Sequence, residues 1–183
     1  MGGIADIGSV NMSAGRAGTG TNAGAGVASS VGGDFLARKS DVIKTRLGLP
    51  PLKDVLIVED DTFDADRLRA TLHVMLGYGL VQRRATTLGS AVDCVIERKP
   101  EVVFLDDYLK PSDNASHTIP FLRRAGYTGP IIVISGAVDR ARQTALMTAG
   151  AIDVIHKDDL DSVRIAEALN KAFTPSAAAQ PTV

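Results

Sequence analysis

Residues Val102–Pro111, "VVFLDDYLKP", place an apolar run of strand length directly before two adjacent acids, Asp106 and Asp107. Such a run is typical of a strand that is buried on both faces, as strands of a parallel sheet are. In open α/β sheets, ligands bind in the crevice outside the carboxyl ends of the strands. The stretch therefore predicts a parallel sheet and, at the two acids, a functional site.

Further strand-like runs lie on both sides of this stretch, and each is followed by apolar residues at helical spacing. Strands are predicted at residues 54–59, 80–86, 101–106, 130–136 and 151–157, and helices at 63–76, 88–99, 117–126, 139–150 and 161–173. Short apolar strands that alternate with helices indicate an α/β fold, a doubly wound parallel sheet with helices on both faces.

The ends of the chain differ from this pattern. Residues 1–33 are mostly Gly, Ala and Ser, so we predict a disordered extension, because it can bury too little apolar surface to offset the entropy of ordering. Residues 34–49 predict a short amphipathic helix, which either packs on its own domain or docks another protein. The folded domain is expected at 53–173, with a flexible tail at 174–183.

Composition excludes several classes of protein. The 183 residues carry a formal charge of −1, which is not the basic footprint of a nucleic-acid-binding protein. The single cysteine, Cys94, cannot form an internal disulfide and fits a reducing compartment. The sequence contains neither an apolar run of membrane-spanning length nor a signal peptide. We expect a cytoplasmic protein that binds neither nucleic acid nor membrane.

The polar residues that close the predicted strands suggest the chemistry. Carboxylates gathered at one sheet edge repel one another unless a cation offsets their charge, and Mg²⁺ prefers such oxygen ligands. A lysine and a serine can bind phosphoryl oxygens, and a glycine leaves room for a tetrahedral group. Together they describe a carboxylate that accepts a phosphoryl group. These strand-end residues are Glu59, Asp60, Asp61, Asp106, Asp107, Ser135, Gly136, His156 and Lys157.

These motifs give residues 53–173 a resemblance to a known family. The stretches "LIVEDD", "PEVVFLDDYL", "PIIVISGA" and "GAIDVIHKDDL" resemble those of a response-regulator receiver domain of two-component signalling, in the CheY-like superfamily. The resemblance implies a flavodoxin-like (βα)5 fold with strand order 2-1-3-4-5. It also implies that the chain accepts a phosphoryl group on an aspartate with Mg²⁺ as cofactor.

The resemblance also assigns residue roles. It makes Asp60 a direct Mg²⁺ ligand, together with the acceptor Asp106 and the backbone carbonyl of Tyr108, while Glu59 acts through water. It implies that Lys157 binds the phosphoryl group and that the Ser135 hydroxyl follows this group by moving toward it.

Other residues at positions known from the family either modulate the reaction or depart from the family pattern. Tyr108, Gly136 and Ala137 surround the phosphoryl group, and a bulky Tyr108 predicts slow loss of it. Val154 stands where the family usually has a switching aromatic residue, so the resemblance does not imply the usual aromatic movement for this chain. The loop "DYLKPSDNASHT", residues 107–118, is longer than is usual in the family and could form a partner surface.

The choice between the two adjacent acids favours Asp106. In the family the acceptor lies six residues beyond a proline that here is Pro100, whereas a family proline four residues after the acceptor would select Asp107 through Pro111. Alternation of side chains along a strand also favours Asp106 and turns Asp107 to the opposite side, as a local polar neighbour.

Other polar residues are predicted to have structural roles. Asp61 and Asp64 suit the cap and first turn of a helix. Arg140 and Arg142 are expected on a solvated helix face, which could contact a partner. We expect His156 to face outward from its strand end.

The resemblance leads to two functional hypotheses. The first is a single-domain response regulator that accepts a phosphoryl group from a histidine kinase or phosphotransfer protein onto Asp106 and signals by protein contact, through 34–49 or 139–150. It would catalyse only its own phosphotransfer and slow autodephosphorylation, so it would not be an enzyme in the usual sense. The alternative is a pseudo-receiver that binds a partner without phosphorylation. A hydrolase is disfavoured because Tyr108 stands where such an enzyme has a second acid.

Overall fold

The structure, a computed structural model, describes residues 30–111 and 113–174. Most of the expected N-terminal and C-terminal tails therefore lies outside the described residues. The elements follow one another as α1 (Ser30–Leu47), β1 (Asp54–Val58), α2 (Thr62–Leu76), β2 (Val81–Ala85), α3 (Leu88–Glu97), β3 (Val102–Asp106), β4 (Tyr108–Leu109), β5 (Asp113–Asn114), α4 (Ala115–Arg124), β6 (Ile131–Ser135), α5 (Arg140–Ala149), β7 (Asp153–His156), a 3-10 turn (Lys157–Asp159) and α6 (Ser162–Phe173).

The main sheet is parallel and has the order β2-β1-β3-β6-β7. This is the predicted order 2-1-3-4-5 once the short hairpin of β4 and β5 is set aside, so the flavodoxin-like α/β fold is confirmed. In register, Asp106 lies beside Ile134 and Ser135 lies beside His156. The carboxyl ends of β1, β3, β6 and β7 therefore meet at one edge.

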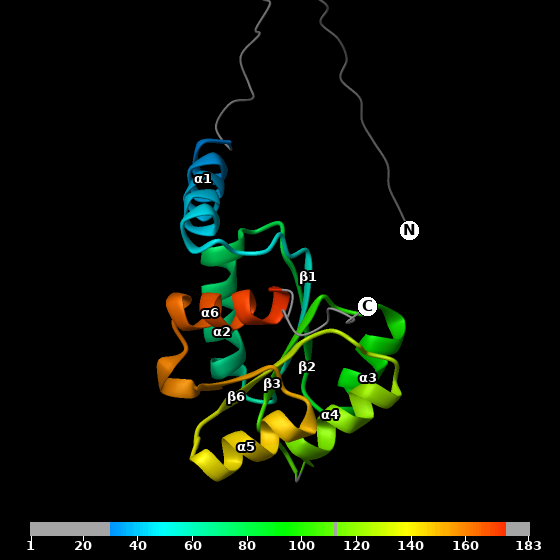
Figure 1. Cartoon of the computed structure of the whole chain (residues 1–183). Coiled ribbons are helices and arrows are strands. Elements are labelled where there is room, and N and C mark those ends of the chain that lie inside the picture. The colour runs from blue at the N-terminus through cyan, green and yellow to red at the C-terminus, as the bar shows by residue number, and fades with distance from the viewer. Residues whose placement is uncertain (1–29, 112, 175–183) are drawn as a thin grey trace, which may run out of the picture.

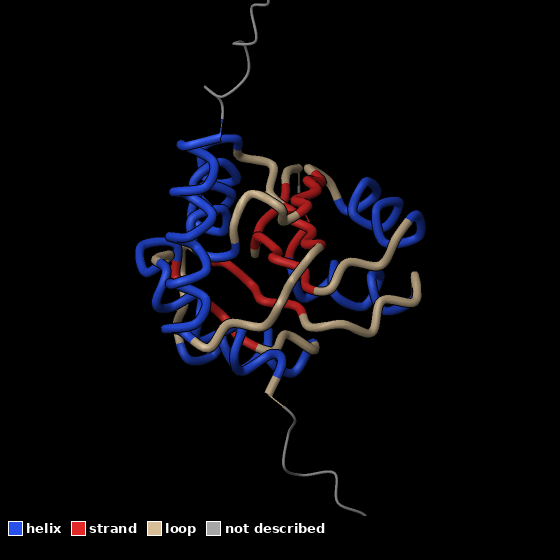
Figure 2. Tube along the Cα trace, turned by 90° about the horizontal axis from the view of Figure 1, so that it is seen from above, coloured by secondary structure: helices blue, strands red, loops and turns tan. Residues whose placement is uncertain are grey.

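Helices cover both faces of this sheet. In Figure 1, α2 and α6 lie on one side of the strands, and α3, α4 and α5 lie on the other. Figure 2 shows the same arrangement from above, with the strands between two groups of helices. Along β1, Val55 and Ile57 join the core beneath α2 and α6, whereas Leu56 and Val58 join the opposite core. The apolar strands are thus explained by burial on both faces.

Helix α1 packs on α2, so the first of the two interpretations of this segment describes the fold. Ser40 is 3 % exposed, and the Nδ2 of Asn170 in α6 donates to the carbonyl of Leu47 at 2.9 Å. Leu47 also packs against the core beneath α2 and α6. The helix begins at Ser30 rather than at residue 34, so the prediction of disorder was wrong for residues 30–33.

The long loop after β3 contains structure that the sequence did not predict. Residues 108–109 and 113–114 pair as an antiparallel hairpin, with Tyr108 opposite Asn114. Leu109 and Ala115 are buried in the core beneath α3, α4 and α5 and hold this hairpin on the domain. Asn114 then caps α4 by accepting from the backbone N–H of His117.

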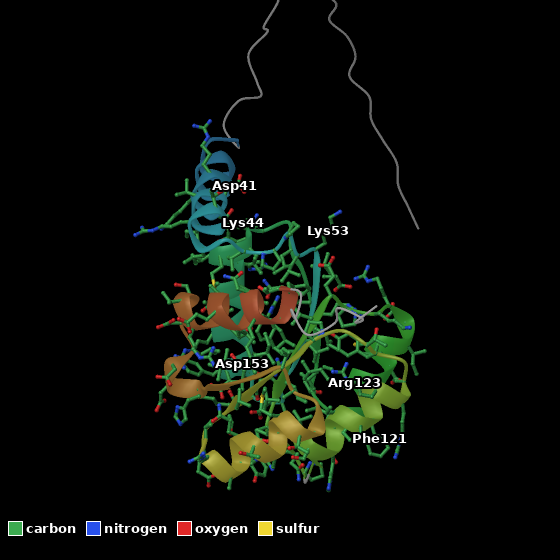
Figure 3. All side chains as sticks on the ribbon, viewed as in Figure 1. Asp41, Lys44, Lys53, Phe121, Arg123 and Asp153 are labelled. Carbon is green, nitrogen blue, oxygen red and sulfur yellow. The ribbon has the colours of Figure 1, made fainter. Side chains whose placement is uncertain are left out.

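Figure 3 shows the side chains on this framework, with Asp41 and Lys44 on α1 at one end of the molecule and Phe121 and Arg123 on α4 toward the other. Within residues 30–111 and 113–174, no helix is both long and apolar enough to cross a membrane.

Candidate functional site

The strand ends bring Glu59, Asp60 and Asp106 together. Each of these acids offers a carboxylate oxygen, and the three oxygens lie within 4.8 Å of one another. Glu59 and Asp106 are each 6 % exposed. Three carboxylates, in which oxygen is the only ligand atom, suit a hard divalent cation such as Mg²⁺ or Ca²⁺. The site therefore fits the cofactor that the sequence predicts.

Burial raises the pKa of both inner acids. Burial is the main cause at Asp106, where hydrogen bonding to Lys157 offsets part of the rise. At Glu59 burial again raises the pKa, the nearby Asp106 adds to the rise, and the N–H of Asp61 with Lys157 opposes it. These carboxylates thus carry a desolvation cost in the charged form, which a bound cation would reduce.

Lys157 contacts two members of the acidic cluster, which consists of Glu59, Asp60 and Asp106. Its Nζ is 3.1 Å from Asp106 Oδ1, 3.1 Å from Glu59 Oε2 and 2.7 Å from Asp64 Oδ2. Burial alone would lower the pKa of Lys157, but hydrogen bonds to Asp64 and Asp106 raise it above its ordinary value. Lys157 therefore places an ammonium group within reach of the predicted acceptor, as its proposed role requires.

Several residues that the sequence analysis did not single out hold this cluster in place. Arg84 of β2 donates to the carbonyls of Glu59 and Asp60, each at 3.1 Å. Arg67 of α2 donates to the carbonyl of Lys157 at 2.9 Å. Lys110, between β4 and β5, lies 3.1 Å from Asp60 Oδ2. Nothing in the sequence spacing of these arginines and lysines distinguishes them from ordinary surface residues, so sequence reasoning could not find them.

The two adjacent acids of β3 have different surroundings. Asp106 contacts Lys157 and the acidic cluster, whereas Asp107 accepts from Ser135 Oγ at 3.0 Å and from Arg142 Nε at 2.9 Å. Arg142 Nη2 also donates to Asp107 Oδ1. The opposite orientation of Asp107 is therefore as predicted, and the role of Asp106 as the acceptor stays a prediction.

The same contacts correct two expectations. Arg142 does not lie on a solvated face, because its guanidinium pairs with a carboxylate that is 1 % exposed. Asp107 is more than a local polar neighbour, since it joins β3, β6 and α5. Ser135 donates to Asp107 in this structure, and its predicted movement toward a phosphoryl group stays a prediction.

The remaining predicted residues are placed as follows. An added Cβ at Gly136 would meet nothing within 4 Å, so there is open space beside it. Ala137 is exposed and donates its N–H to Ser135 Oγ, while Val154 is buried at 4 % exposure. Tyr108 is 65 % exposed, with its ring 5.5 Å from the Arg142 guanidinium carbon. The role of its carbonyl as a metal ligand stays a prediction.

The predicted caps are largely confirmed. Asp61 caps α2 by accepting from the N–H groups of Phe63 and Asp64. Asp64 stands in the first turn, as expected, but it also binds Lys157. His156 is half-buried, and its Nδ1 accepts from the N–H of Asp158.

Comparisons with known proteins agree with this geometry. A curated relative, a probable C4-dicarboxylate response regulator DctR from Priestia megaterium, is 25 % identical over 103 residues, which are 56 % of this chain and 44 % of the relative. The chain thus spans less than half the length of that relative.

Solved structures of similar fold include other response regulators. A response regulator from Burkholderia pseudomallei, with a phosphorylated aspartic acid, a calcium ion and citrate, has a TM-score of 0.57 and 23 % identity, covering 65 % of this chain and 68 % of that one. NtrX from Brucella abortus has a TM-score of 0.58 and 24 % identity, covering 66 % and 26 %. The signal receiver domain of the putative response regulator NarL from Mycobacterium tuberculosis has a TM-score of 0.54 and 16 % identity, covering 65 % and 98 %.

The model of one protein family matches most of the folded part. It is the response regulator receiver domain, and the match runs over residues 55–170. This range contains all five strands of the main sheet except Asp54, the first residue of β1. With the parallel sheet and the acidic cluster already established, this chain belongs to the response regulator receiver domain family.

Proposed function

We propose that this protein accepts a phosphoryl group on Asp106 from a histidine kinase or a histidine phosphotransfer protein. The observation that carries the proposal is the contact of Asp106 with both the acidic cluster and the Lys157 ammonium, at 3.1 Å. The similar Burkholderia pseudomallei regulator contains a phosphorylated aspartic acid and a calcium ion, which supports the same chemistry here. Signalling by protein contact and a cytoplasmic location remain part of this proposal.

The reaction is a transfer between a nitrogen and an oxygen. A carboxylate oxygen of Asp106 attacks the phosphorus of a phosphohistidine, the new O–P bond forms, and the N–P bond breaks with its electron pair returning to the imidazole, which takes up a proton. Lys157 offsets the negative charge on the phosphoryl oxygens. Autodephosphorylation is attack by water on the same phosphorus, which releases inorganic phosphate and regenerates the Asp106 carboxylate.

Mg²⁺ would be held by Asp60 and Asp106, with Glu59 nearby, and would neutralise charge on the phosphoryl oxygens. Two arginines of the chain hold the groups that would face this charge in place. Arg84 fixes the backbone of Glu59 and Asp60, and Arg67 fixes that of Lys157. The carboxylates and the ammonium are thus oriented before any phosphodonor arrives.

A second candidate function is a pseudo-receiver that binds its partner without phosphorylation. The observation that favours it is Val154, a buried aliphatic residue where the family usually has a switching aromatic one. The complete set of Asp60, Asp106 and Lys157 at the strand ends argues against it.

Intact mass spectrometry separates the two. Wild type, Asp106→Asn and Asp107→Asn are incubated with Mg²⁺ and acetyl phosphate, and then with a phosphorylated histidine phosphotransfer protein. We expect one added phosphoryl group in wild type and none in Asp106→Asn. Label that survives Asp106→Asn but is lost in Asp107→Asn would reverse the assignment, and no label from either donor would favour the pseudo-receiver.

A further inference from the structure

The carboxylate of Asp107 is buried and is shared between two elements beyond β3. Asp107 is 1 % exposed, so water cannot satisfy it. Its oxygens accept from Ser135 Oγ, which closes β6, and from Nε and Nη2 of Arg142, which lies in the first turn of α5. A buried carboxylate tolerates its charge only while such donors remain in place. Asp107 therefore depends on both partners.

Arg142 links this carboxylate to more of the surface. Its Nη1 lies 3.3 Å from Ser116 Oγ in α4, and its guanidinium lies over the ring of Tyr108. Its backbone N–H donates to Asp139 Oδ1 at 2.6 Å, which is the cap of α5. A change in the position of the guanidinium would therefore alter contacts at the start of α5, in the hairpin and at the start of α4.

A phosphoryl group on Asp106 would disturb this arrangement directly. Asp106 and Asp107 are adjacent, and a phosphoryl group adds roughly one negative charge and strongly accepting oxygens. The Ser135 hydroxyl has one proton, which it gives in this structure either to Asp107 or to the carbonyl of Ala137, each at 3.0 Å. The new oxygens compete with Asp107 for that proton, while the added charge on the neighbouring residue repels the Asp107 carboxylate and attracts the Arg142 guanidinium.

We propose that Asp107, Ser135 and Arg142 form a charge sensor that reports the phosphoryl state of Asp106 to the first turn of α5. The inference rests on the proposed phosphorylation of Asp106 and goes beyond it by naming the residues that read the added charge. Asp107 is a positioning residue, which holds Ser135 and Arg142 in the unphosphorylated protein. Phosphorylation weakens its hold on both, and the start of α5 becomes freer to move. The sensor gives the chain a connection from the acceptor to a helix surface that does not require an aromatic residue at Val154.

The molecule contains a matched control for this sensor. Asp153 is also a buried acid, 6 % exposed, and Arg164 Nη1 lies 2.7 Å from its Oδ2. The Arg164 side chain is 28 % exposed and that of Arg142 is 23 % exposed, so the two arginines are similarly placed. Asp153 begins β7 and thus lies at the edge of the sheet opposite the strand ends that form the site. The variant Arg164→Gln therefore removes an ion pair to a buried acid that cannot sense Asp106, and Lys171, 3.2 Å from Asp153 Oδ1, stays in place.

Amide hydrogen exchange of the full chain, with and without Mg²⁺ and beryllofluoride as a stable phosphoryl analogue, tests the sensor. Occupancy is verified for each variant by native mass spectrometry. In wild type we expect exchange at the start of α5 to rise roughly tenfold or more on modification, the effect of losing one hydrogen bond to a charged group. In Arg142→Gln the same amides should exchange fast from the outset and respond little, whereas Arg164→Gln should respond as wild type does.

Two results would overturn the sensor alone: a modified wild type in which the exchange of α5 is unchanged, or an Arg142→Gln variant that responds as wild type does. A wild type that neither binds the analogue nor takes up a phosphoryl group from a donor would overturn the proposed function and the sensor together. If Arg142→Gln fails to fold, Arg142→Lys takes its place, because it keeps the charge but not the two-pronged contact with Asp107.

Discussion

At the scale of single residues, the adjacent acids of β3 show how much identical side chains can differ. Asp106 faces Lys157 and the acidic cluster, whereas Asp107 faces Arg142 and Ser135. Strand alternation alone turns neighbouring side chains in opposite directions, so the sequence was enough to expect two environments. It was not enough to find Arg142, because that contact depends on how α5 returns over the strand ends.

Tyr108 gives a prediction at this scale. Replacing it by Asn removes a bulky side chain next to the acceptor and allows water better access to the phosphoryl group. We expect Tyr108→Asn to lose phosphate faster than wild type, by roughly tenfold, which corresponds to about 1.4 kcal/mol of barrier. The measurement is the decay of the phosphorylated protein by intact mass after the donor is removed.

Because the Tyr108 ring lies over Arg142, the control is Tyr108→Phe, which keeps the ring. An unchanged decay rate in Tyr108→Asn would show that the side chain does not govern the access of water.

At the scale of elements, the helices and buried strands were predictable and the hairpin was not. Strands such as 102–106 carry long apolar runs, and helices such as α3 carry apolar residues at helical spacing, because both bury large surfaces. Residues 108–114 are mostly polar, and Leu109 is the only buried residue among those of the hairpin that the structure describes, so no periodicity marks β4 and β5. The start of α1 was missed because its first residues have a composition typical of disorder.

The junction of α1 with α2 gives a prediction for Gly77. This glycine ends α2 with φ 84° and ψ 164°, a conformation that is accessible almost only to glycine. An added Cβ would also lie 3.0 Å from Ser40 Oγ of α1. We expect Gly77→Ala to lower the free energy of unfolding by about 1–3 kcal/mol, measured by urea denaturation.

Gly79→Ala is the matched control, since a Cβ at Gly79 would meet nothing within 4 Å. Equal effects of the two substitutions would contradict the special conformation of Gly77.

The connection of β7 to α6 gives a pH-dependent prediction. Burial would raise the pKa of Asp153, but Arg164 and Lys171 together hold it below its ordinary value. A depressed pKa means that the ionised carboxylate stabilises the fold at pH values above about 3.9, and that this stability is lost as the pH falls through the folded-state pKa. Asp153→Asn should therefore cost about 1–3 kcal/mol at neutral pH.

The difference between wild type and Asp153→Asn should shrink below about pH 4, where the wild-type carboxyl becomes protonated. Urea midpoints at neutral and acidic pH measure it. A difference that is constant with pH would mean that packing, rather than charge, is responsible.

At the scale of the whole molecule, the sheet gathers charges that are far apart in the sequence. Glu59, Asp106 and Lys157 come from the ends of β1, β3 and β7, and they meet because these strands are parallel in the order β1-β3-β6-β7. This much could be predicted from alternation and topology. The supporting contacts of Arg84 and Lys110 could not, because they depend on how long side chains fold back over loops.

The gathered carboxylates predict that Mg²⁺ stabilises the entire fold. A cation that binds only the folded protein adds about 2.7 kcal/mol to the free energy of unfolding at one hundred times its dissociation constant. We expect the thermal midpoint of wild type to rise with Mg²⁺ concentration and that of Asp60→Asn to rise much less. Asp153→Asn, which removes a carboxylate at the other edge, should respond as wild type does. Equal responses of all three would argue against binding at this site.

The contact of Asn170 with Leu47 joins the first and last helices of the described fold at the edge of the sheet opposite the acidic cluster. Asn170 lies near the end of α6, so a handle attached after this helix would leave the folded part beside Leu47, on the side away from the acidic cluster. A sensor chip or bead that holds the protein by such a handle would leave Asp106 facing the solution. Attachment after α6 is thus suited to a surface-mounted probe of phosphodonors.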